Sequence, residues 1–315
     1  MPFLSVVTGC FNEVENVEDL CGQVAAVIDG LPPRDGEPYT YEHIFIDNAS
    51  TDGTVEVLRG ICATDARVKV IVNTRNFGHI RSPYHALLQT RGEAIIGLAS
   101  DLQDPPGMIP QFVREWEAGY KVVVGVKEES LEKKSLFFVR GLFYKLIDRL
   151  SEVPLVRNFT GFGMYDRVVI DKLREIDDPY PYFRGLICDL GYARAEIPYA
   201  QPARKRGITK NNFYSLYDLA MLGITNHSKV PLRLAAMGGF ALSIIALVVA
   251  AAYLVIKLTF WNTFSLGLAP LVIGVYFIGS VQLFFIGILG EYIGSIHTQV
   301  YHRPLVIEKE RINFD

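Results

Sequence analysis

The stretch Ile95–Pro106, IIGLASDLQDPP, decides the predicted fold, because an apolar run stops abruptly on acidic and amide side chains. The run Ala94–Ala99 is typical of a buried strand, and the two prolines mark the start of the next helix. Asp101 and Gln103 alternate at the strand's end, so both can point beyond the carboxyl edge of a parallel sheet. Their oxygens suit a hard divalent cation, which would bind a diphosphate. The alternative is an acidic turn that caps the helix from Met108.

Strands and helices alternate around this stretch. Strands are predicted at Phe3–Thr8, Glu42–Ile46, Val68–Val72, Ala94–Ala99 and Lys121–Val126, and helices at Val17–Ile28, Ile80–Thr90 and Met108–Ala118, with a further helix starting near Ser50. This alternation predicts the α/β class, with a mostly parallel sheet covered by helices on both faces. Ligands then bind at the carboxyl ends of the strands. Asn12, Asp47 and Asp101 each follow a strand, so we expect all three at that edge.

Two long apolar segments lie near the end of the chain, which is 50% hydrophobic overall. Leu234–Ile256 has 23 residues and Leu266–Gly290 has 25, and neither contains a charge. Each is long enough to cross about 30 Å of hydrocarbon, so the sequence predicts a hairpin of two transmembrane helices. Two buried helices of a soluble domain are the alternative, which these lengths disfavour.

The distribution of charge predicts that both ends of this hairpin are cytoplasmic. The N-terminus has no positive region and only a short apolar run, so we expect the first 230 or so residues to stay on the side of synthesis. Only Lys257 lies in the predicted connecting loop. Basic residues flank the two spans on the other side, at Arg204, Lys205, Arg206, Lys210, Lys229, Arg233, Arg303, Lys309 and Arg311.

Composition excludes some functions. The net charge is −3 and no stripe of basic and aromatic residues is present, so nucleic acid is not an expected partner. The cysteines have no metal-binding spacing, and a cytosolic domain would keep them reduced, so we expect core thiols at Cys10, Cys21, Cys62 and Cys188.

Amphipathic segments separate the predicted domain from the spans. Ser135–Leu150 places its apolar residues on one stripe, which favours an interfacial helix over a core helix beside a membrane anchor. Residues 211–231 have a similar, weaker character. The predicted organisation is therefore a cytoplasmic domain at 1–210, a juxtamembrane helix at 211–231, two transmembrane helices within 232–294, and a cytoplasmic tail at 295–315.

The chain resembles the inverting family 2 glycosyltransferases of GT-A fold, and among them the membrane-anchored polyprenyl-phosphate glycosyltransferases related to dolichyl-phosphate mannose synthase. The resemblance covers almost the whole length. The motifs that carry it are Phe11-Asn12-Glu13, Asp47 with Ser50-Thr51-Asp52-Gly53-Thr54, Arg75-Asn76-Phe77-Gly78-His79, Asp101-Leu102-Gln103-Asp104-Pro105-Pro106, Arg204-x-x-Gly207-x-Thr209-Lys210, and Gly290-Glu291-Tyr292-Ile293-Gly294. Each motif is weak alone, but their order and spacing are specific.

The resemblance implies roles for these residues. Asp101 and Gln103 would bind Mg²⁺ or Mn²⁺ on the donor's diphosphate, with Asp104 as a third candidate catalytic residue. Lys127 falls where the family places an arginine for the acceptor phosphate, with a solvated surface lysine as the alternative. Arg140 is expected to bind the same phosphate because it lies at the edge of the apolar stripe, where a long side chain can reach the headgroups. The nucleotide sugar would contact Phe11, Asn12, Glu13, Asp47 and Arg75, together with Arg204, Thr209 and Lys210 on a loop that closes over the phosphates. Two cations and a hydroxyl suit that negative charge.

Five positions depart from the family pattern. Ala99 replaces the first aspartate of the usual Asp-x-Asp, and Asn48-Ala49 follow Asp47 where relatives have aspartate and glycine. Gly9 replaces a proline of the first turn. Gly161 lies where many relatives carry an aspartate at the acceptor side.

The predicted function is inverting transfer of a sugar, from a UDP-sugar or another nucleotide sugar, to a polyprenyl phosphate at the cytoplasmic face of a bacterial or archaeal plasma membrane. The lipid bilayer is thus a partner, and a homo-oligomer through the transmembrane helices is a further expectation. One rival is a processive polysaccharide synthase, because Gln111–Trp116 resembles its Gln-x-x-Arg-Trp motif with one residue inserted. Another is an inactive membrane-bound scaffold, in view of Ala99 and Gly161. An acceptor phosphate is already ionised at neutral pH, so no general base is required.

Overall fold

The computed structural model describes residues 3–128, 156, 158–202, 221–223, 225, 228–259 and 268–314. These residues form one eight-stranded sheet in the order β7-β5-β6-β4-β1-β2-β3-β8. The strands are β1 (Phe3–Cys10), β2 (Thr40–Asp47), β3 (Val68–Asn73), β4 (Ala94–Ala99), β5 (Val122–Lys127), β6 (Phe159–Asp166), β7 (Arg194–Tyr199) and β8 (Glu308–Ile312).

The pairing of these strands confirms the α/β class and the mostly parallel sheet. β1 pairs in parallel with β2 and β4, and β2 with β3. β5 pairs in parallel with β7. β6 lies between β4 and β5 and is antiparallel to both. Because β6 runs the opposite way, its first residues lie at the same edge as the carboxyl ends of β4 and β5.

Helices cover both faces of the sheet, as the alternation predicts. On one face α1 (Val17–Asp29), α2 (Thr54–Thr64), the 3₁₀ turn η1 (Pro106–Met108) and α4 (Ile109–Glu117) pack on a core that includes Leu20, Phe45 and Phe112. On the other face α3 (Gly78–Leu88), α6 (Arg167–Ile176) and α7 (Phe183–Asp189) pack on a core that includes Ile46, Tyr84 and Tyr165. Strand residues alternate between the two cores because successive side chains of a strand point to opposite faces.

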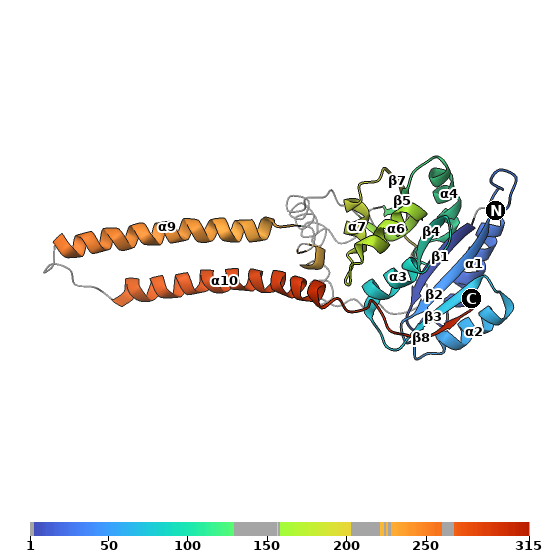
Figure 1. The fold of residues 1–315 in the computed structure, drawn as a ribbon, viewed down its shortest axis with the longest axis horizontal. Helices are drawn as coiled ribbons and strands as arrows, with labels where there is room; N and C mark the ends of the chain where they lie inside the picture. Colours follow the sequence, from blue (N-terminus) through green and yellow to red (C-terminus); the bar gives the residue numbers. More distant parts are fainter. Residues whose placement is uncertain are drawn as a thin grey trace.

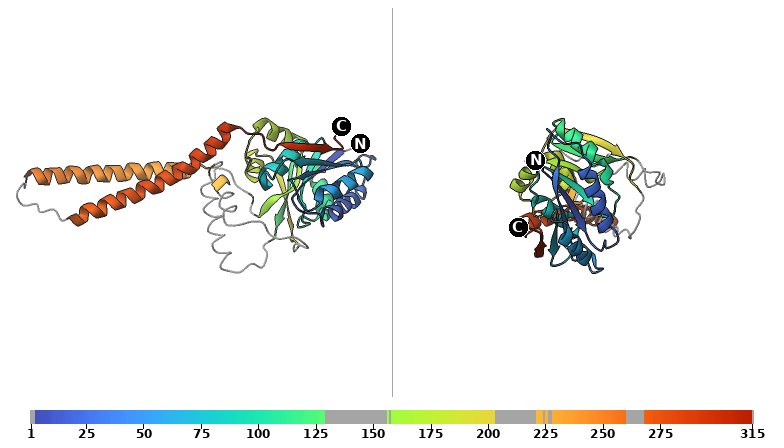
Figure 2. Two further views of the ribbon diagram at one scale, coloured as in Figure 1. Left: turned by 90° about the horizontal axis from the view of Figure 1, so that it is seen from below. Right: turned by 90° about the vertical axis from the view of Figure 1, so that its right-hand side faces the viewer.

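Two long helices extend from one side of this domain. They are α9 (Val230–Thr259) and α10 (Leu268–Tyr301), and Figures 1 and 2 show them side by side, away from the sheet. Both are long and apolar enough to cross a membrane, with mean hydropathies of 2.1 and 2.0 over their most apolar parts. The predicted span 234–256 lies within α9. The predicted span 266–290 lies within α10, except that 266 and 267 are outside the described residues.

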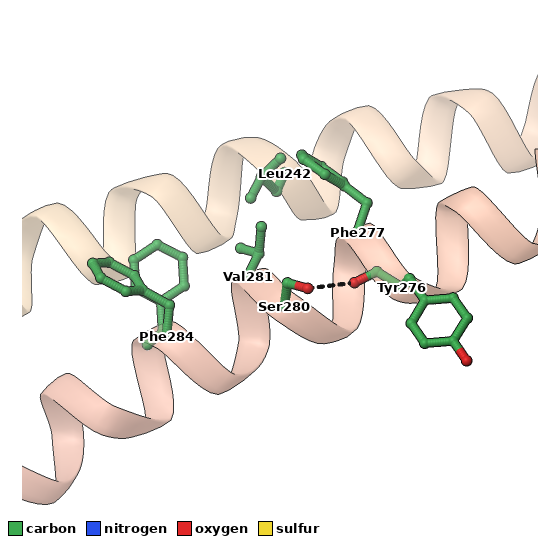
Figure 3. Close-up of a pocket in the computed structure, with 7 residues that line it drawn as sticks. Leu242, Tyr276, Phe277, Ser280, Val281 and Phe284 are labelled. Atoms are coloured by element: carbon green, nitrogen blue, oxygen red, sulfur yellow. Dashed lines mark hydrogen bonds between the residues drawn. The ribbon is translucent and has the colours of Figure 1, made fainter.

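The two long helices leave a shallow apolar groove between them. Leu242 of α9 and Phe277, Val281 and Phe284 of α10 line it, and its volume is about 550 Å³ (Figure 3). The hydroxyl of Ser280 donates to the backbone carbonyl of Tyr276 at 2.7 Å, within its own helix. The groove therefore offers an apolar surface.

The chain returns from the hairpin to the sheet. β8 pairs antiparallel with β3, with Val70 opposite Ile312, and so adds an edge strand that the sequence analysis did not predict. Figure 1 shows the C-terminus on the same side of the sheet as the N-terminus, far from the tip of the hairpin. Residues expected to form a tail thus complete the sheet.

Several predicted features lie outside the described residues. They are the helix Ser135–Leu150 with Arg140, the loop that carries Arg204, Thr209 and Lys210, and most of the predicted juxtamembrane helix 211–231.

Candidate functional site

A cavity of about 460 Å³ lies beyond the carboxyl ends of β1 and β4. Its walls come from the turn after β1, the start of α3, the end of β4, the start of β6 and the start of α7. β1 begins near the N-terminus, on the side of the domain opposite the hairpin, so its carboxyl end faces the hairpin (Figure 1). The cavity is therefore at the edge where α/β proteins bind ligands, and on the side of the two long helices.

Asp101 lines this cavity and is 8% exposed. Its Oδ1 accepts a hydrogen bond from the backbone N–H of Gln103 at 3.2 Å. Leu102 between them has a φ of 59°, a left-handed conformation that turns the chain back on itself. Gln103 is half-buried and is not among the described residues that line the cavity. Of the predicted metal pair, the structure thus brings only Asp101 to the cavity.

Glu13 and Asp104 also line the cavity, but Asp101 is the member of the predicted metal pair that reaches it. Asp101 fits a cation that takes its other ligands from substrate and water. Magnesium commonly binds in this way, through one or two carboxylates and the phosphates of its substrate. No cluster of three or more histidine, cysteine, aspartate or glutamate residues with metal-binding geometry occurs in the described part of the chain. The residues present therefore fit a metal bound jointly with a diphosphate.

Asp104 joins two strand ends. Its Oδ1 accepts from the Tyr199 hydroxyl at 2.9 Å, and its Oδ2 accepts from the backbone N–H of Ala99 at 3.2 Å. It is 6% exposed, and this burial raises its pKa above the ordinary range. Neither η1 nor α4 begins with a side-chain cap, so the interpretation of an acidic turn that caps this helix is wrong.

The turn after β1 is bonded to the turn after β2. Asn12 has a φ of 57°; its N–H donates to Oγ of Ser50 at 2.8 Å, and its Oδ1 accepts from the Thr51 N–H at 2.8 Å. The Glu13 N–H donates to Oγ1 of Thr54 at 3.0 Å. The polar residues of the second turn therefore fix the first, and they place Glu13 in the cavity wall.

Asp47 lies beneath these turns. It is fully buried, and its Oδ2 accepts the Ser50 N–H at 2.9 Å. Burial raises its pKa. Asp47, Phe11 and Asn12 are not among the described residues that line the cavity, so their contacts with a nucleotide stay predictions.

Arg75 lies on the surface beside its own motif. Its guanidinium is 4.0 Å from the centre of the Phe77 ring, and its Nη1 donates to the carbonyl of Asn76 at 3.1 Å. Arg75 does not belong to the described lining of the cavity. The structure thus leaves it apart from Asp101, and its predicted contact with the nucleotide sugar stays a prediction.

Asn48 connects the turn after β2 to the loop before α3. It was noted from the sequence only because relatives have aspartate at this position. Its Nδ2 donates to the carbonyl of Gly78 at 3.1 Å, and its Oδ1 accepts from the Phe77 N–H at 2.8 Å and from Nδ2 of Asn73 at 3.2 Å. An aspartate would present an oxygen to the Gly78 carbonyl. The amide at this position therefore fits the loop that leads into α3.

Lys127 ends β5 near the acidic residues. Lys127 is half-buried, and its backbone N–H donates to the carbonyl of Asn158 at 3.2 Å. Its positive charge opposes the rise in the pKa of Asp104 that burial causes. It is not among the described residues that line the cavity, and its contact with an acceptor phosphate stays a prediction.

Further polar residues line the cavity without having been given a role in the sequence analysis. Among them are His79 at the start of α3, Thr160 in β6 and Arg184 in α7. Nη1 of Arg184 donates to the carbonyl of Phe159 at 3.2 Å, and its guanidinium is 5.3 Å from the centre of the Tyr182 ring. The sequence did contain a signal for His79, because this residue belongs to the motif Arg75-Asn76-Phe77-Gly78-His79. No spacing or periodicity marks Arg184.

Two of the departures have a structural reason. Gly161 has a φ of +104°, and its carbonyl accepts from the Tyr165 hydroxyl at 2.8 Å. A side chain there would be strained, so this backbone does not favour aspartate. A Cβ on Gly9 would lie 2.7 Å from Cγ of Pro83, so that glycine makes room for the proline of α3.

The near match to the processive-synthase motif lies outside the cavity. Trp116 is buried in the core, and its Nε1 donates to Oδ2 of Asp166 at 2.8 Å. Gln111 and Arg114 are exposed on α4. These side chains have a packing role in the structure, which disfavours that alternative.

Known proteins match this chain over the domain that contains the sheet and over the two long helices. The family model "Glycosyl transferase family 2" matches residues 5–174. An uncharacterized glycosyltransferase of Synechocystis is 30% identical over 308 residues, 96% of this chain and 94% of its own. The bactoprenol glucosyl transferase of Shigella phage SfV is 30% identical over 311 residues, 97% of this chain and 98% of its own.

Solved structures align with part of the chain. Glucosyl-3-phosphoglycerate synthase from Mycobacterium tuberculosis, in complex with Mn²⁺, UDP and phosphoglyceric acid, is 20% identical. The alignment covers 71% of this chain and 76% of that one, with a TM-score of 0.48.

Proposed function

Because this chain belongs to glycosyltransferase family 2, we propose that it transfers a sugar with inversion from a UDP-sugar to a polyprenyl phosphate. The observation that carries the proposal is the cavity with Asp101 on the side of the domain that faces the apolar hairpin. A lipid held in the bilayer would present its phosphate from that side. The relatives named bactoprenol glucosyl transferase match along the hairpin as well as the domain, which supports the same acceptor class.

The hairpin would hold the enzyme in the membrane. α9 and α10 expose apolar side chains along their length, as Phe240 at 72% and Leu283 at 71% illustrate. Hydrocarbon would stabilise such surfaces, whereas water would not. With the positive residues at the domain side, the catalytic domain would lie at the cytoplasmic face.

The reaction needs no proton transfer from a side chain. An oxygen of the acceptor phosphate donates a lone pair to the anomeric carbon, and the bond from that carbon to the nucleoside diphosphate breaks with its electron pair. Asp101 would hold a divalent cation, Mg²⁺ or Mn²⁺, which neutralises charge on the leaving diphosphate when bound. Glu13 and the turn fixed by Ser50 and Thr54 would position the nucleoside, and the cavity walls would exclude water from the sugar.

The test is a panel of UDP-, GDP- and other nucleotide sugars offered to the purified full-length protein in detergent, with Mg²⁺ or Mn²⁺ and a polyprenyl phosphate. We expect a labelled lipid product from at least one UDP-sugar, and none when free polyprenol replaces the polyprenyl phosphate. Equal transfer to polyprenol, or no transfer from any donor by protein that is folded, would contradict the proposal.

A further inference from the structure

We propose that Arg184, His79 and Thr160 form the subsite for the phosphate monoester of the acceptor lipid. This inference rests on the proposed function and adds the acceptor's place within the cavity. All three residues line the same cavity as Asp101, and they come from α7, α3 and β6.

The order of the strands separates Arg184 and Thr160 from the nucleoside turns, whereas His79 follows β3 on the nucleoside side of the cavity. The turns after β1 and β2 lie on one side of β4, and β6 lies on the other. Arg184 is bonded to Phe159 at the start of β6, which lies at the carboxyl edge because β6 is antiparallel to β4. Along the carboxyl edge of the sheet, the nucleoside turns therefore come first, Asp101 after β4 comes next, and Arg184 beside β6 comes last.

Inversion requires this arrangement of the two phosphates. The incoming oxygen must approach the anomeric carbon from the side opposite to the leaving diphosphate, so the two anionic groups lie on opposite sides of the sugar. Asp101 marks the side of the metal and diphosphate. A cationic group across the cavity from it is the group needed to bind the second phosphate.

The guanidinium of Arg184 is held in position for an anion. The Phe159 carbonyl accepts from Nη1, and the Tyr182 ring lies 5.3 Å from the guanidinium carbon. A guanidinium carries five N–H donors in a planar fork that matches a phosphate. Because the side chain is already oriented by its protein contacts, less conformational entropy is lost when phosphate binds.

His79 adds a neutral donor beside Arg184. Burial lowers the pKa of its imidazole, and the charge of Arg184 lowers it further, which favours the neutral form of the ring. A neutral imidazole has one N–H to donate and does not repel the guanidinium. The side chain of Thr160 on β6 is hydrogen-bonded to Tyr199, so its hydroxyl adds a neutral polar group that is already held in place. Together the three groups offer one fixed positive charge and neutral hydrogen bonds.

The experiment compares Arg184→Gln and Arg184→Lys with Arg114→Gln, which removes a mostly exposed arginine on α4. We expect Arg184→Gln to raise the KM for polyprenyl phosphate about tenfold or more, since a charged hydrogen bond is lost. UDP binding, measured by calorimetry, should change less than twofold, and the lysine variant should recover part of the acceptor affinity. Arg114→Gln should leave both the KM for polyprenyl phosphate and the UDP affinity unchanged.

Direct lipid binding separates this inference from the proposed function. Wild-type protein in nanodiscs should retain labelled polyprenyl phosphate in preference to polyprenol, and Arg184→Gln should lose that preference. Retention without transfer would contradict the function and support the subsite. Transfer with an unchanged acceptor KM in Arg184→Gln, or a parallel loss of UDP affinity, would overturn the subsite. Thr160→Val, on an exposed strand position, repeats the test if Arg184→Gln does not fold.

Discussion

The hydroxyl of Tyr199 donates to Oδ1 of Asp104 at 2.9 Å, so the end of β7 is joined to the loop after β4 at the cavity. The other oxygen of Asp104 accepts the Ala99 N–H. Both oxygens are thus used to hold the loop that carries Asp101. This contact makes Asp104 a positioning residue in the proposed mechanism rather than a base.

The pH dependence of turnover tests that role. The second pKa of a phosphate monoester is about 6, so we expect the acidic limb of kcat/KM to follow the titration of the acceptor. Asp104→Asn should keep that limb, because the asparagine oxygen can still accept from Tyr199. The measurement is kcat/KM between about pH 5 and 8 for both proteins. Loss of the acidic limb together with most of the rate would identify Asp104 as a general base.

Asp101→Asn should reduce turnover at least about a hundredfold while the protein still folds, because the carboxylate lies at the sheet's edge and holds the proposed metal. The assay is sugar transfer at saturating substrates, with the melting temperature as the measure of folding. Glu18→Gln, on the exposed face of α1, is the matched control and should keep full activity. Comparable activity in the two variants would exclude Asp101 as the metal ligand.

Asn48→Ala should lower the free energy of unfolding by about 2–3 kcal/mol, because it leaves the buried Phe77 N–H and Asn73 amide without their acceptor. Asn48→Asp keeps an acceptor for both and should lose less, although it repels the Gly78 carbonyl. Urea unfolding in detergent measures the difference. If alanine were tolerated as well as aspartate, the network would contribute nothing to stability.

Glu308 links β8 to the domain in a pH-dependent way. Arg311 donates to the carboxylate of Glu308, and Nε2 of His85 lies 2.5 Å from its Oε1. These contacts lower the pKa of Glu308, and Arg311 is the main cause. A lowered pKa stabilises the fold above the ordinary carboxyl pKa, and the effect is lost as the pH falls through the native value.

Glu308→Gln should therefore destabilise the protein by about 1 kcal/mol at pH 7 and by progressively less below about pH 4. The comparison is urea unfolding across that range, with Glu175→Gln, an exposed residue of α6, as the control. A destabilisation that stays constant with pH would show that ionisation of Glu308 has no part in it.

The sequence predicted the parts of the fold that have a strong apolar signal. Ala94–Ala99 is predicted and observed with the same bounds, because an unbroken apolar run ends there on polar residues. The central strand β6, which was also missed, has its apolar residues interrupted by Gly161 and Gly163. The other two missed strands carry little apolar signal: β7 is Arg-Ala-Glu-Ile-Pro-Tyr and β8 is Glu-Lys-Glu-Arg-Ile. Both lie at the edges of the sheet, where charge and proline are common because one side pairs with no neighbour.

The same reasoning found only part of the site. Asp101 was predicted because acidic and amide side chains follow a buried strand at the carboxyl edge of the sheet. Gln103 was paired with it by alternation, but the left-handed turn at Leu102 breaks that alternation. Arg184 depends on α7 packing against β6, a tertiary contact that leaves no pattern in the sequence.

The pairing of β8 with β3 also sets an order of events during synthesis. β3 emerges from the ribosome early, while its edge partner emerges only after both long helices. The edge of the sheet therefore stays open until the hairpin has been made and the chain has returned to the domain. The hairpin is thus synthesised before the last strand can pair, and a chain that stops before Glu308 would expose a ready-made pairing edge.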